Sequence, residues 1–368
     1  MKIIARYITK EILLTFFTIT SILLLIVISN RFALYLAKAA TGELPISLVF
    51  KIVGLYTPEF LSYLIPLSFF VAILFAYGRM YADSEMTVLS ACGLSSNYII
   101  RLTLTLALIV LLFTGALTVW IVPEVASLRE KALHEGEAFG VMQSLMPGRF
   151  QTFSDGGRLV FYIEETTQKK GSLKGIFIAE RPNNAAAKPD QGWTVITAEE
   201  AHVAADEENH RYNLVLQKGE RYQGLPGKAD YSVVKFQEYG REIPHQTETV
   251  ANDALRLKKT MSLMSSKDPE DAAELQWRLS LPLSILILAL VAIPLAKVNP
   301  RHGRFARFLP AIVVYIVYYN LFTISKRWVT NEVLPQFIGV WWVHILFLSL
   351  GLFLIAKESG WLRRMKSI

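Results

Sequence analysis

The residues best suited to chemistry lie in a short polar segment, residues 83–94, with the sequence DSEMTVLSACGL. Asp83 or Ser84 is placed to cap a helix, and Glu85 follows in the first turn, where a carboxylate complements the helix dipole. Gly93 suits the left-handed position at the helix end. Apolar residues recur at helical spacing along one side, so we predict a short amphipathic helix to which a partner binds. A solvated turn of helix without a partner is the alternative.

Elsewhere the sequence has no catalytic constellation. Gly227-Lys228 is followed by Ala229 and lacks the upstream glycine of a phosphate-binding loop. The six histidines are scattered, and no two have the i, i+4 spacing of a helical zinc site. Ser154-Asp155 has no base placed beside it. We therefore expect no active site, metal or cofactor in this chain, and any ATP hydrolysis must belong to another protein.

The elements around the polar segment are membrane spans. The chain has 368 residues, of which 52% are hydrophobic and only 19% are charged, too apolar for a soluble globular protein. Six runs reach the ~20 residues that a bilayer crossing requires. They are Ile12–Asn30, Ile52–Tyr77, Leu102–Pro123, Leu279–Ala296, Phe308–Ser325 and Val333–Ala356. Glu59, which follows Pro58 in the second run, is interpreted as a residue at the outer headgroup level, with a cavity or a partner as the alternative.

Basic residues set the orientation of these spans. Lysine and arginine are enriched on cytosolic sides, and one side of the predicted bundle has far more of them than the other. Both termini are therefore predicted to be cytosolic, with Cys92 on the same side and the large polar segment outside. The cytosolic set is Lys2, Arg6, Lys10, Arg79, Arg101, Lys297, Arg301, Arg304, Arg307, Lys357, Arg363, Arg364 and Lys366, against Arg31, Lys38, Lys326 and Arg327 opposite.

The polar segment between the third and fourth runs is predicted to be an all-β domain. Short stretches rich in β-branched and aromatic residues are separated by Gly, Pro, Asn and Asp clusters, which is typical of a sandwich or jelly roll. The stretches are 158–165, 173–180, 193–204, 211–217 and 231–237. Tyr212, Leu214 and Leu216 share one face of the fourth.

Three motifs resemble the F/G permease family of the lipopolysaccharide export system. They are SEMTVLSACGLS after the second run, ELQWRLSLPLS at the start of the fourth and VNPRHGR before the fifth. The pattern extends over nearly the whole chain and is closer to the F branch than to the G branch. The resemblance implies three plus three transmembrane helices and a periplasmic β-jellyroll, divided into residues 1–122, 123–277 and 278–368.

The resemblance also implies a role and partners. Proteins of this family pair as F and G subunits in the bacterial inner membrane and sit on a dimer of a cytosolic ATPase, which uses ATP and Mg²⁺. They extract lipopolysaccharide and pass it to a periplasmic bridge, together with a single-span periplasmic protein. This chain would then be a non-catalytic transport subunit, with no role in nucleic-acid binding.

Site residues are carried over by position. The coupling helix that docks on the ATPase would be residues 83–94, with Glu85 making a charge contact. Arg31 and Lys38 would bind the lipid headgroup, although Leu34 stands where the family pattern has a second basic residue. Snorkelling would explain both cations equally well. Acyl chains would meet Leu34, Tyr212, Leu214 and Leu216, with sandwich core as the alternative for the last three. The docking set is Asp83, Ser84, Glu85, Thr87, Leu89, Cys92, Gly93 and Leu94.

Two other classes of function stay open at this point. A mechanotransmission subunit would use the cytosolic helix to move the outer domain without transporting lipid, so it would need neither an apolar cavity nor a basic rim. A membrane enzyme that modifies lipids is the second alternative, and the lack of a catalytic constellation argues against it.

Overall fold

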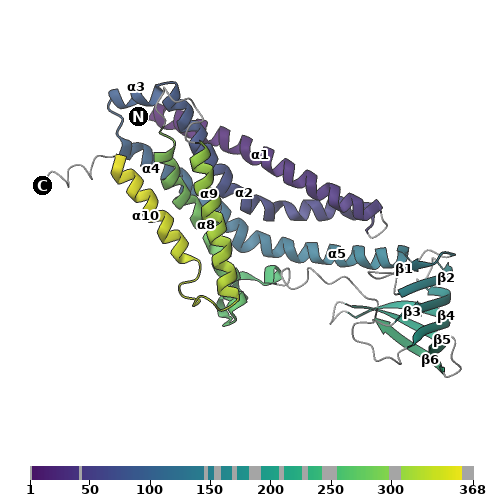
Figure 1. The fold of residues 1–368 in the computed structure, drawn as a ribbon. Helices are drawn as coiled ribbons and strands as arrows, with labels where there is room; N and C mark the ends of the chain where they lie inside the picture. The colour runs from purple at the N-terminus through teal and green to yellow at the C-terminus, as the bar shows by residue number, and fades with distance from the viewer. Residues whose placement is uncertain are drawn as a thin grey trace. The chain divides into compact units, whose positions relative to one another are not determined.

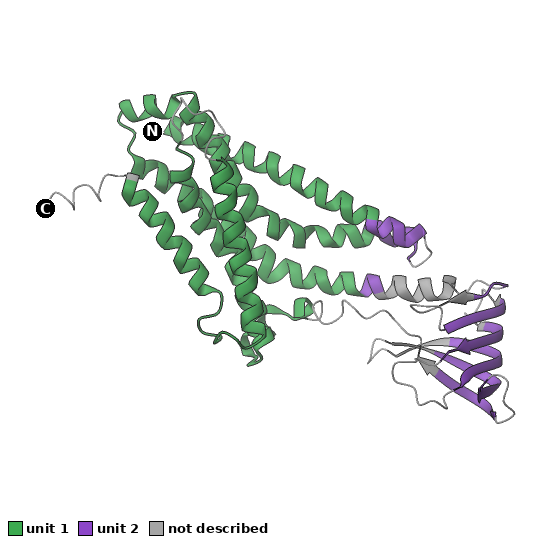
Figure 2. Cartoon of the chain, viewed as in Figure 1, with its two compact units in different colours: residues 1–33, 51–130, 249–368 green, residues 34–50, 131–248 purple. Residues whose placement is uncertain are grey.

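The computed structural model describes residues 2–40, 44–144, 148–152, 159–167, 172–181, 192–206, 211–225, 231–242, 255–297 and 308–358. Long helices make up most of the chain, and a separate antiparallel sheet follows the helix α5 (Figure 1). The chain divides into two compact units, coloured separately in Figure 2: residues 1–33, 51–130 and 249–368 form the first, and residues 34–50 and 131–248 form the second.

Within the residues that the structure describes, five helices are long and apolar enough to cross a membrane. Three of them are α1, α2 and α4, the last continuing into α5, and the other two are α8 and α9. The short helices α3 and α7 lie outside this set. The bounds are α1 Lys2–Ala40, α2 Ile46–Ala82, α3 Glu85–Ala91, α4 Ser96–Ala116, α5 Val122–Ser144, α7 Thr260–Ser265, α8 Pro269–Leu295 and α9 Phe308–Thr330.

The last predicted span is shorter than the apolar run that suggested it. The run begins at Val333, but the helix α10 begins only at Trp341 and ends at Glu358, and it is classed with the shorter apolar helices. Turns occupy residues 331–340, where Glu332 and Gly339 have the left-handed φ angles of 57° and 45°. Such angles cannot continue a right-handed helix. A sixth span is therefore not confirmed, and the described part of the chain contains five.

A π-helical turn, η1 Leu117–Ile121, joins α4 to α5. The Val122 amide donates to the Leu117 carbonyl, five residues back, and Pro123 has no amide hydrogen for the Val119 carbonyl. The Thr260 hydroxyl on α7 supplies the missing donor at 2.7 Å. The carbonyl at the interruption of the helix therefore has a hydrogen-bond donor from a residue 141 positions later in the chain.

Helix α8 is the centre of the helical unit, and α4, α9 and α10 all pack against it. Within its most apolar window 67% of the residues are buried, compared with 17% for α1 and 22% for α9. Gly351 allows α10 to approach closely, because an added Cβ would lie 3.3 Å from the Leu290 Cβ. Helices α1 and α9 therefore keep wide apolar faces that the described residues do not cover.

The second unit contains a six-stranded sheet in which each strand pairs antiparallel with the next along the chain. The strands are β1 Gln151–Thr152, β2 Leu159–Thr167, β3 Ser172–Glu180, β4 Trp193–Asp206, β5 Arg211–Gly224 and β6 Ser232–Glu242. Every predicted stretch coincides with one of these strands, although β5 runs on to Gly224 instead of ending near Gln217. The described strands form one meander and not two facing sheets, so the predicted jelly roll is not confirmed.

One face of the sheet has an apolar core. Ile178 and Ile196 are fully buried on neighbouring strands, and Leu216 joins them from β5. Gly219 lies where β4, β5 and β6 meet, and a Cβ there would fall 2.2 Å from the Thr197 carbonyl oxygen and 2.5 Å from the Phe236 ring. Only glycine fits between these atoms without a shift of the backbone.

Candidate functional site

The predicted docking helix exists, but it begins differently from the prediction. Ser84 precedes α3 with a left-handed φ of 61°, and its side chain makes no capping hydrogen bond. The predicted cap at this residue is therefore wrong, because a capping residue holds an extended backbone that turns its oxygen toward the first amides. The end of the helix agrees with the prediction: Gly93 has φ 89°, and the Leu94 amide donates to the Leu89 carbonyl at 3.0 Å.

The segment 83–94 has an anchored face and a free face. Met86 and Leu94 are buried in the core of the helical unit, so Leu94 holds the segment in place and does not present a surface. Asp83, Thr87 and Cys92 are exposed, and Glu85 and Leu89 are half-buried. Val88 lies two residues after Met86, on the other side of the helix, and is 60% exposed. The free face thus mixes acidic, polar and apolar side chains.

Glu85 is bound by the first turns of α1. The Tyr7 hydroxyl donates to Oε2 of Glu85 at 2.8 Å and accepts from Nη2 of Arg79 at 3.3 Å. Arg79 in turn pairs with Glu11 at 2.8 Å. Sequence reasoning missed Tyr7, and the only available signal was that Tyr7 and Glu11 share one face of a helix at i, i+4 spacing.

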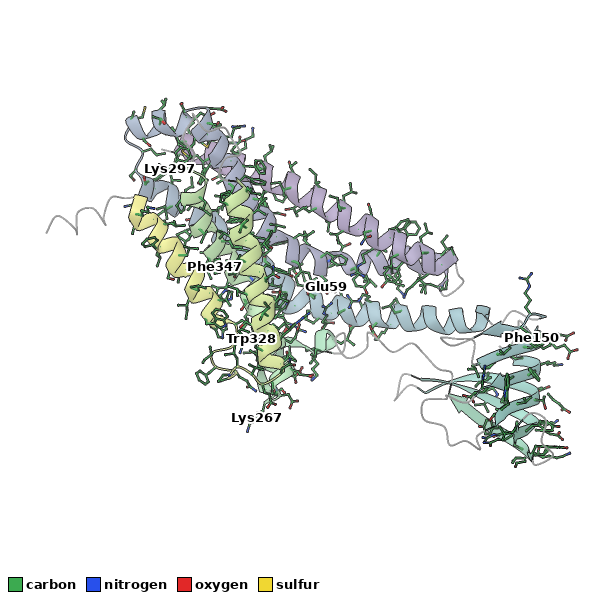
Figure 3. All side chains as sticks on the ribbon, viewed as in Figure 1. Glu59, Phe150, Lys267, Lys297, Trp328 and Phe347 are labelled. Atoms are coloured by element: carbon green, nitrogen blue, oxygen red, sulfur yellow. The ribbon has the colours of Figure 1, made fainter. Side chains whose placement is uncertain are left out.

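Glu59 is buried inside the helical unit and has partners there, as the alternative interpretation predicted, and its level in the membrane stays a prediction (Figure 3). It is 5% exposed and binds two arginines: Nη1 of Arg129 lies 2.5 Å from Oε2, and Nη1 of Arg256 lies 2.6 Å from Oε1. The Arg129 guanidinium also lies 4.2 Å from the centroid of the Tyr56 ring. The cluster joins α2, α5 and the segment that returns from the sheet.

A second buried network fixes the returning segment to α8. Arg278 donates to the Lys258 carbonyl at 2.9 Å and to the Arg256 carbonyl at 3.1 Å, and it pairs with Glu274 at 3.1 Å. Lys258 binds Asp271 at 2.7 Å, and this hydrogen bond raises the pKa of the Lys258 ammonium above its ordinary value. These contacts satisfy charges that burial would otherwise penalise.

The predicted headgroup cations have separate surroundings. The Arg31 guanidinium lies 5.5 Å from the Tyr56 ring centroid and 5.3 Å from that of Phe60, which places it over aromatic faces of α2. The Lys38 ammonium lies 5.8 Å from the ring of Tyr35 on its own helix. Leu34 is 44% exposed on α1. Their part in lipid binding stays a prediction.

The predicted acyl-chain residues of the sheet are inside its core. Leu214 and Leu216 are 1% and 0% exposed, and they pack with the apolar side chains of β2, β3 and β4. Tyr212 lies on β5 opposite Ala205, and its side chain falls outside the described residues. Within the ranges that the structure describes, no three His, Cys, Asp or Glu side chains come together in a way that could hold a metal ion.

Long apolar helices joined by buried ion pairs, with a β unit inserted between the third and the fourth, define a multi-pass membrane protein. A family model described as "Lipopolysaccharide export system permease LptF/LptG" matches residues 6–357, so the chain belongs to this family of inner-membrane permeases and the predicted resemblance is confirmed.

Relatives with the name "Lipopolysaccharide export system permease protein LptF" agree with the predicted F-like character. The protein from Escherichia coli strain K12 is 28% identical over 365 residues, which cover 99% of this chain and 98% of the relative. The protein from Shigella flexneri matches with the same values.

Proposed function

We propose that this chain is a transport subunit that extracts lipopolysaccharide from the inner membrane while a separate cytosolic ATPase supplies the energy. The observation that carries the proposal is the free face of α3, where Glu85 is held by Tyr7 beside exposed Val88. An ordered carboxylate next to an apolar side chain is a surface suited to specific docking, since it joins charge to buried area. Membership of the permease family supports the same role.

The partners of the proposed complex include a second permease subunit, and the described surfaces of two helices support that pairing. Helices α1 and α9 have few buried residues in their apolar windows, which supports pairing with a homologous G subunit around a lipid cavity. Arg31 and Lys38 would hold the phosphates of the lipid, and Leu34 would meet its acyl chains. The single-span periplasmic protein and the periplasmic bridge would receive the lipid beyond the membrane. Both termini would then face the cytosol.

Transfer of acyl chains to the core of the sheet would require the strands of the sheet to move apart. Leu214 and Leu216 are buried, so a lipid can reach them only if the strands around them separate. A sheet core that opens for an acyl chain exchanges one apolar contact for another, which keeps the cost of opening low. The mechanotransmission alternative requires no such exchange.

The ATPase contact is tested by charge reversal. Glu85→Lys should remove the ATPase that co-purifies with the complex, because the basic group facing Glu85 would meet a like charge. Glu332→Lys, at an exposed turn after α9, is the matched control and should retain the ATPase. Equal ATPase recovery with wild type, Glu85→Ala and Glu85→Lys would contradict docking through this residue.

Lipid passage is tested separately. A photo-crosslinking residue at position 31, 34 or 214 should give lipopolysaccharide adducts in cells, and these adducts should decline when the ATPase is inactivated. A chain that forms no lipid adduct at any of the three positions would support mechanotransmission instead.

A further inference from the structure

A groove of about 850 Å³ lies on α8 between the helices α4 and α10. Leu104 and Leu108 of α4 line one side, Ile345 and Leu348 of α10 line the other, and side chains of α8 such as Leu286 lie between them. We call this feature the α8 groove. Neither α1 nor α9 lines it, so it is separate from the surfaces assigned above to the G subunit and the lipid cavity.

The packing of the helices creates the α8 groove. Gly351 lets α10 approach α8, since an added Cβ would lie 3.3 Å from the Leu290 Cβ. Gly115 lets α4 approach α8 at another level, where an added Cβ would lie 3.8 Å from the Pro282 Cγ. Each wall is thus held against α8 by its own close contact. The groove is therefore a fixed feature of the helical unit and does not depend on the rotamer of one side chain.

The dimensions of the α8 groove suit a single acyl chain. Its lining lies within residues 101–108, 283–290 and 341–348, so it extends over seven positions on each helix. Seven positions correspond to about 10 Å of helix axis, or about two turns. The hydrocarbon core of a bilayer is about 30 Å thick, so the groove fits within the depth of one leaflet. A transmembrane helix of a partner would find only these two turns to pack against.

Arg101 gives the α8 groove its charge. It lies at the end of the groove nearest the start of α4, five positions after Ser96, and its side chain is exposed. Among the carboxylates that the structure describes, none pairs with Arg101 and none lines the groove. A long basic side chain can keep its stem on an apolar surface while its guanidinium reaches the headgroup level. A guanidinium there binds a phosphate through two parallel hydrogen bonds.

We propose that the α8 groove binds one acyl chain of an anionic glycerophospholipid, whose phosphate is held by Arg101. One cation matches a lipid with one phosphate, whereas the several phosphates of lipopolysaccharide would require more. The bound lipid belongs to the leaflet on the α3 side of the helical unit, which is the cytosolic leaflet in the orientation proposed above. The site requires neither the ATPase nor the transport of lipopolysaccharide.

The bound lipid would connect α10 to α4. Helix α10 packs on α8 and α9, while Ile345 on its groove side is 66% exposed and Leu108 across the groove is 47% exposed. Inside a bilayer, contacts between apolar groups are favourable through close packing. An acyl chain that fills the groove contacts both side chains at once. A ligand that binds only the folded protein stabilises it, so the lipid should raise the Tm of the complex.

The binding experiment uses the purified complex, washed in neutral detergent and then incubated with phosphatidylglycerol or with phosphatidylcholine, which has no net charge. Native mass spectrometry counts the bound lipids. Arg101→Gln should retain one phosphatidylglycerol fewer per complex and bind it about tenfold more weakly at this site. Lys357→Gln, at the end of α10 and outside the groove, is the matched control and should bind as wild type. Equal phosphatidylglycerol binding and equal Tm in Arg101→Gln and wild type would overturn the proposal.

Photo-crosslinking identifies what occupies the α8 groove. In the washed complex, a crosslinking residue at position 108 should give glycerophospholipid adducts. Position 109 is the control, because Ile109 is 60% exposed on α4 but does not line the groove, and it should give none. Adducts of position 108 with lipopolysaccharide or with a polypeptide would overturn the proposal, as would equal adducts at both positions. None of these results bears on docking through α3, which the Glu85 variants test separately.

Discussion

The Glu59 carboxylate and the Arg129 guanidinium meet at 2.5 Å, although 70 positions separate them in the chain. The Arg129 side chain is 1% exposed and that of Glu59 is 6% exposed, so the pair lies away from water. Arg256 reaches the second carboxylate oxygen from the returning segment. One carboxylate thus fastens both connections of the β unit, α5 and the returning segment, to α2 inside the helical unit.

Removal of Glu59 should destabilise the helical unit strongly. Glu59→Ala leaves two arginines facing each other without a carboxylate, and breaking a buried pair from one side costs about 3–5 kcal/mol. Thermal unfolding in detergent should show a large fall in Tm. Glu124→Ala is the control, because its pair with Lys259 is 3.9 Å long and both side chains are largely exposed. Such a pair contributes about 0–1 kcal/mol. Equal Tm values for the two variants would contradict the fastening role.

Thr260 should contribute measurably to the free energy of unfolding. Thr260→Val removes the donor for the Val119 carbonyl, which Pro123 cannot serve, and the acceptor for Nη1 of Arg278. An unpaired buried polar group costs about 1–3 kcal/mol, so we expect a clear loss of unfolding free energy.

Thr105→Val is the matched control for Thr260→Val. Its hydroxyl is exposed and donates to the Arg101 carbonyl, which lies within α4. Denaturant titration of both variants should place the unfolding midpoint of Thr260→Val well below that of Thr105→Val. Coincident midpoints would mean that the π turn does not depend on Thr260.

The sequence predicted what depends on local pattern and missed what depends on distance. Apolar runs located five helices, and β-branched stretches located five strands, because length and alternation act within a few residues. The position of Glu59 could not be predicted, since its partners are 70 and 197 positions away. The extra apolar length before α10 misled the prediction because turns at Glu332 and Gly339 separate that stretch from the helix. Tyr7 likewise meets Glu85 only after α1 folds against α2.

Gly219 should be required for the sheet. In Gly219→Ala the new methyl group meets the Thr197 carbonyl oxygen and the Phe236 ring, and overpacking of this kind costs about 1–3 kcal/mol. Gly240→Ala on β6 is the control, because a Cβ there has open space. Hydrogen exchange of the full chain should show faster exchange across β4, β5 and β6 in Gly219→Ala alone. Equal protection in the two variants would indicate that the strands adjust at no cost.

Cys92 gives a direct test of the predicted orientation. It is the only cysteine in the chain, and it is exposed at the end of α3. If both termini face the cytosol, a membrane-impermeant maleimide should label Cys92 in inverted vesicles and not in intact spheroplasts. Because thiolate reactivity requires access, the exposed side chain should react readily once the reagent reaches its side.

A reporter on the other side makes the labelling experiment symmetric. Met261 is exposed on α7, close to the start of α8 and so at the opposite end of the predicted spans from Cys92. In the background Cys92→Ser, the substitution Met261→Cys should be labelled in intact spheroplasts, and Cys92→Ser alone should take no label from either side. Labelling of Cys92 in spheroplasts, with Met261→Cys accessible only in inverted vesicles, would reverse the orientation. The free face of α3 would then lie on the side away from every cytosolic ATPase, because Cys92 directly follows that helix.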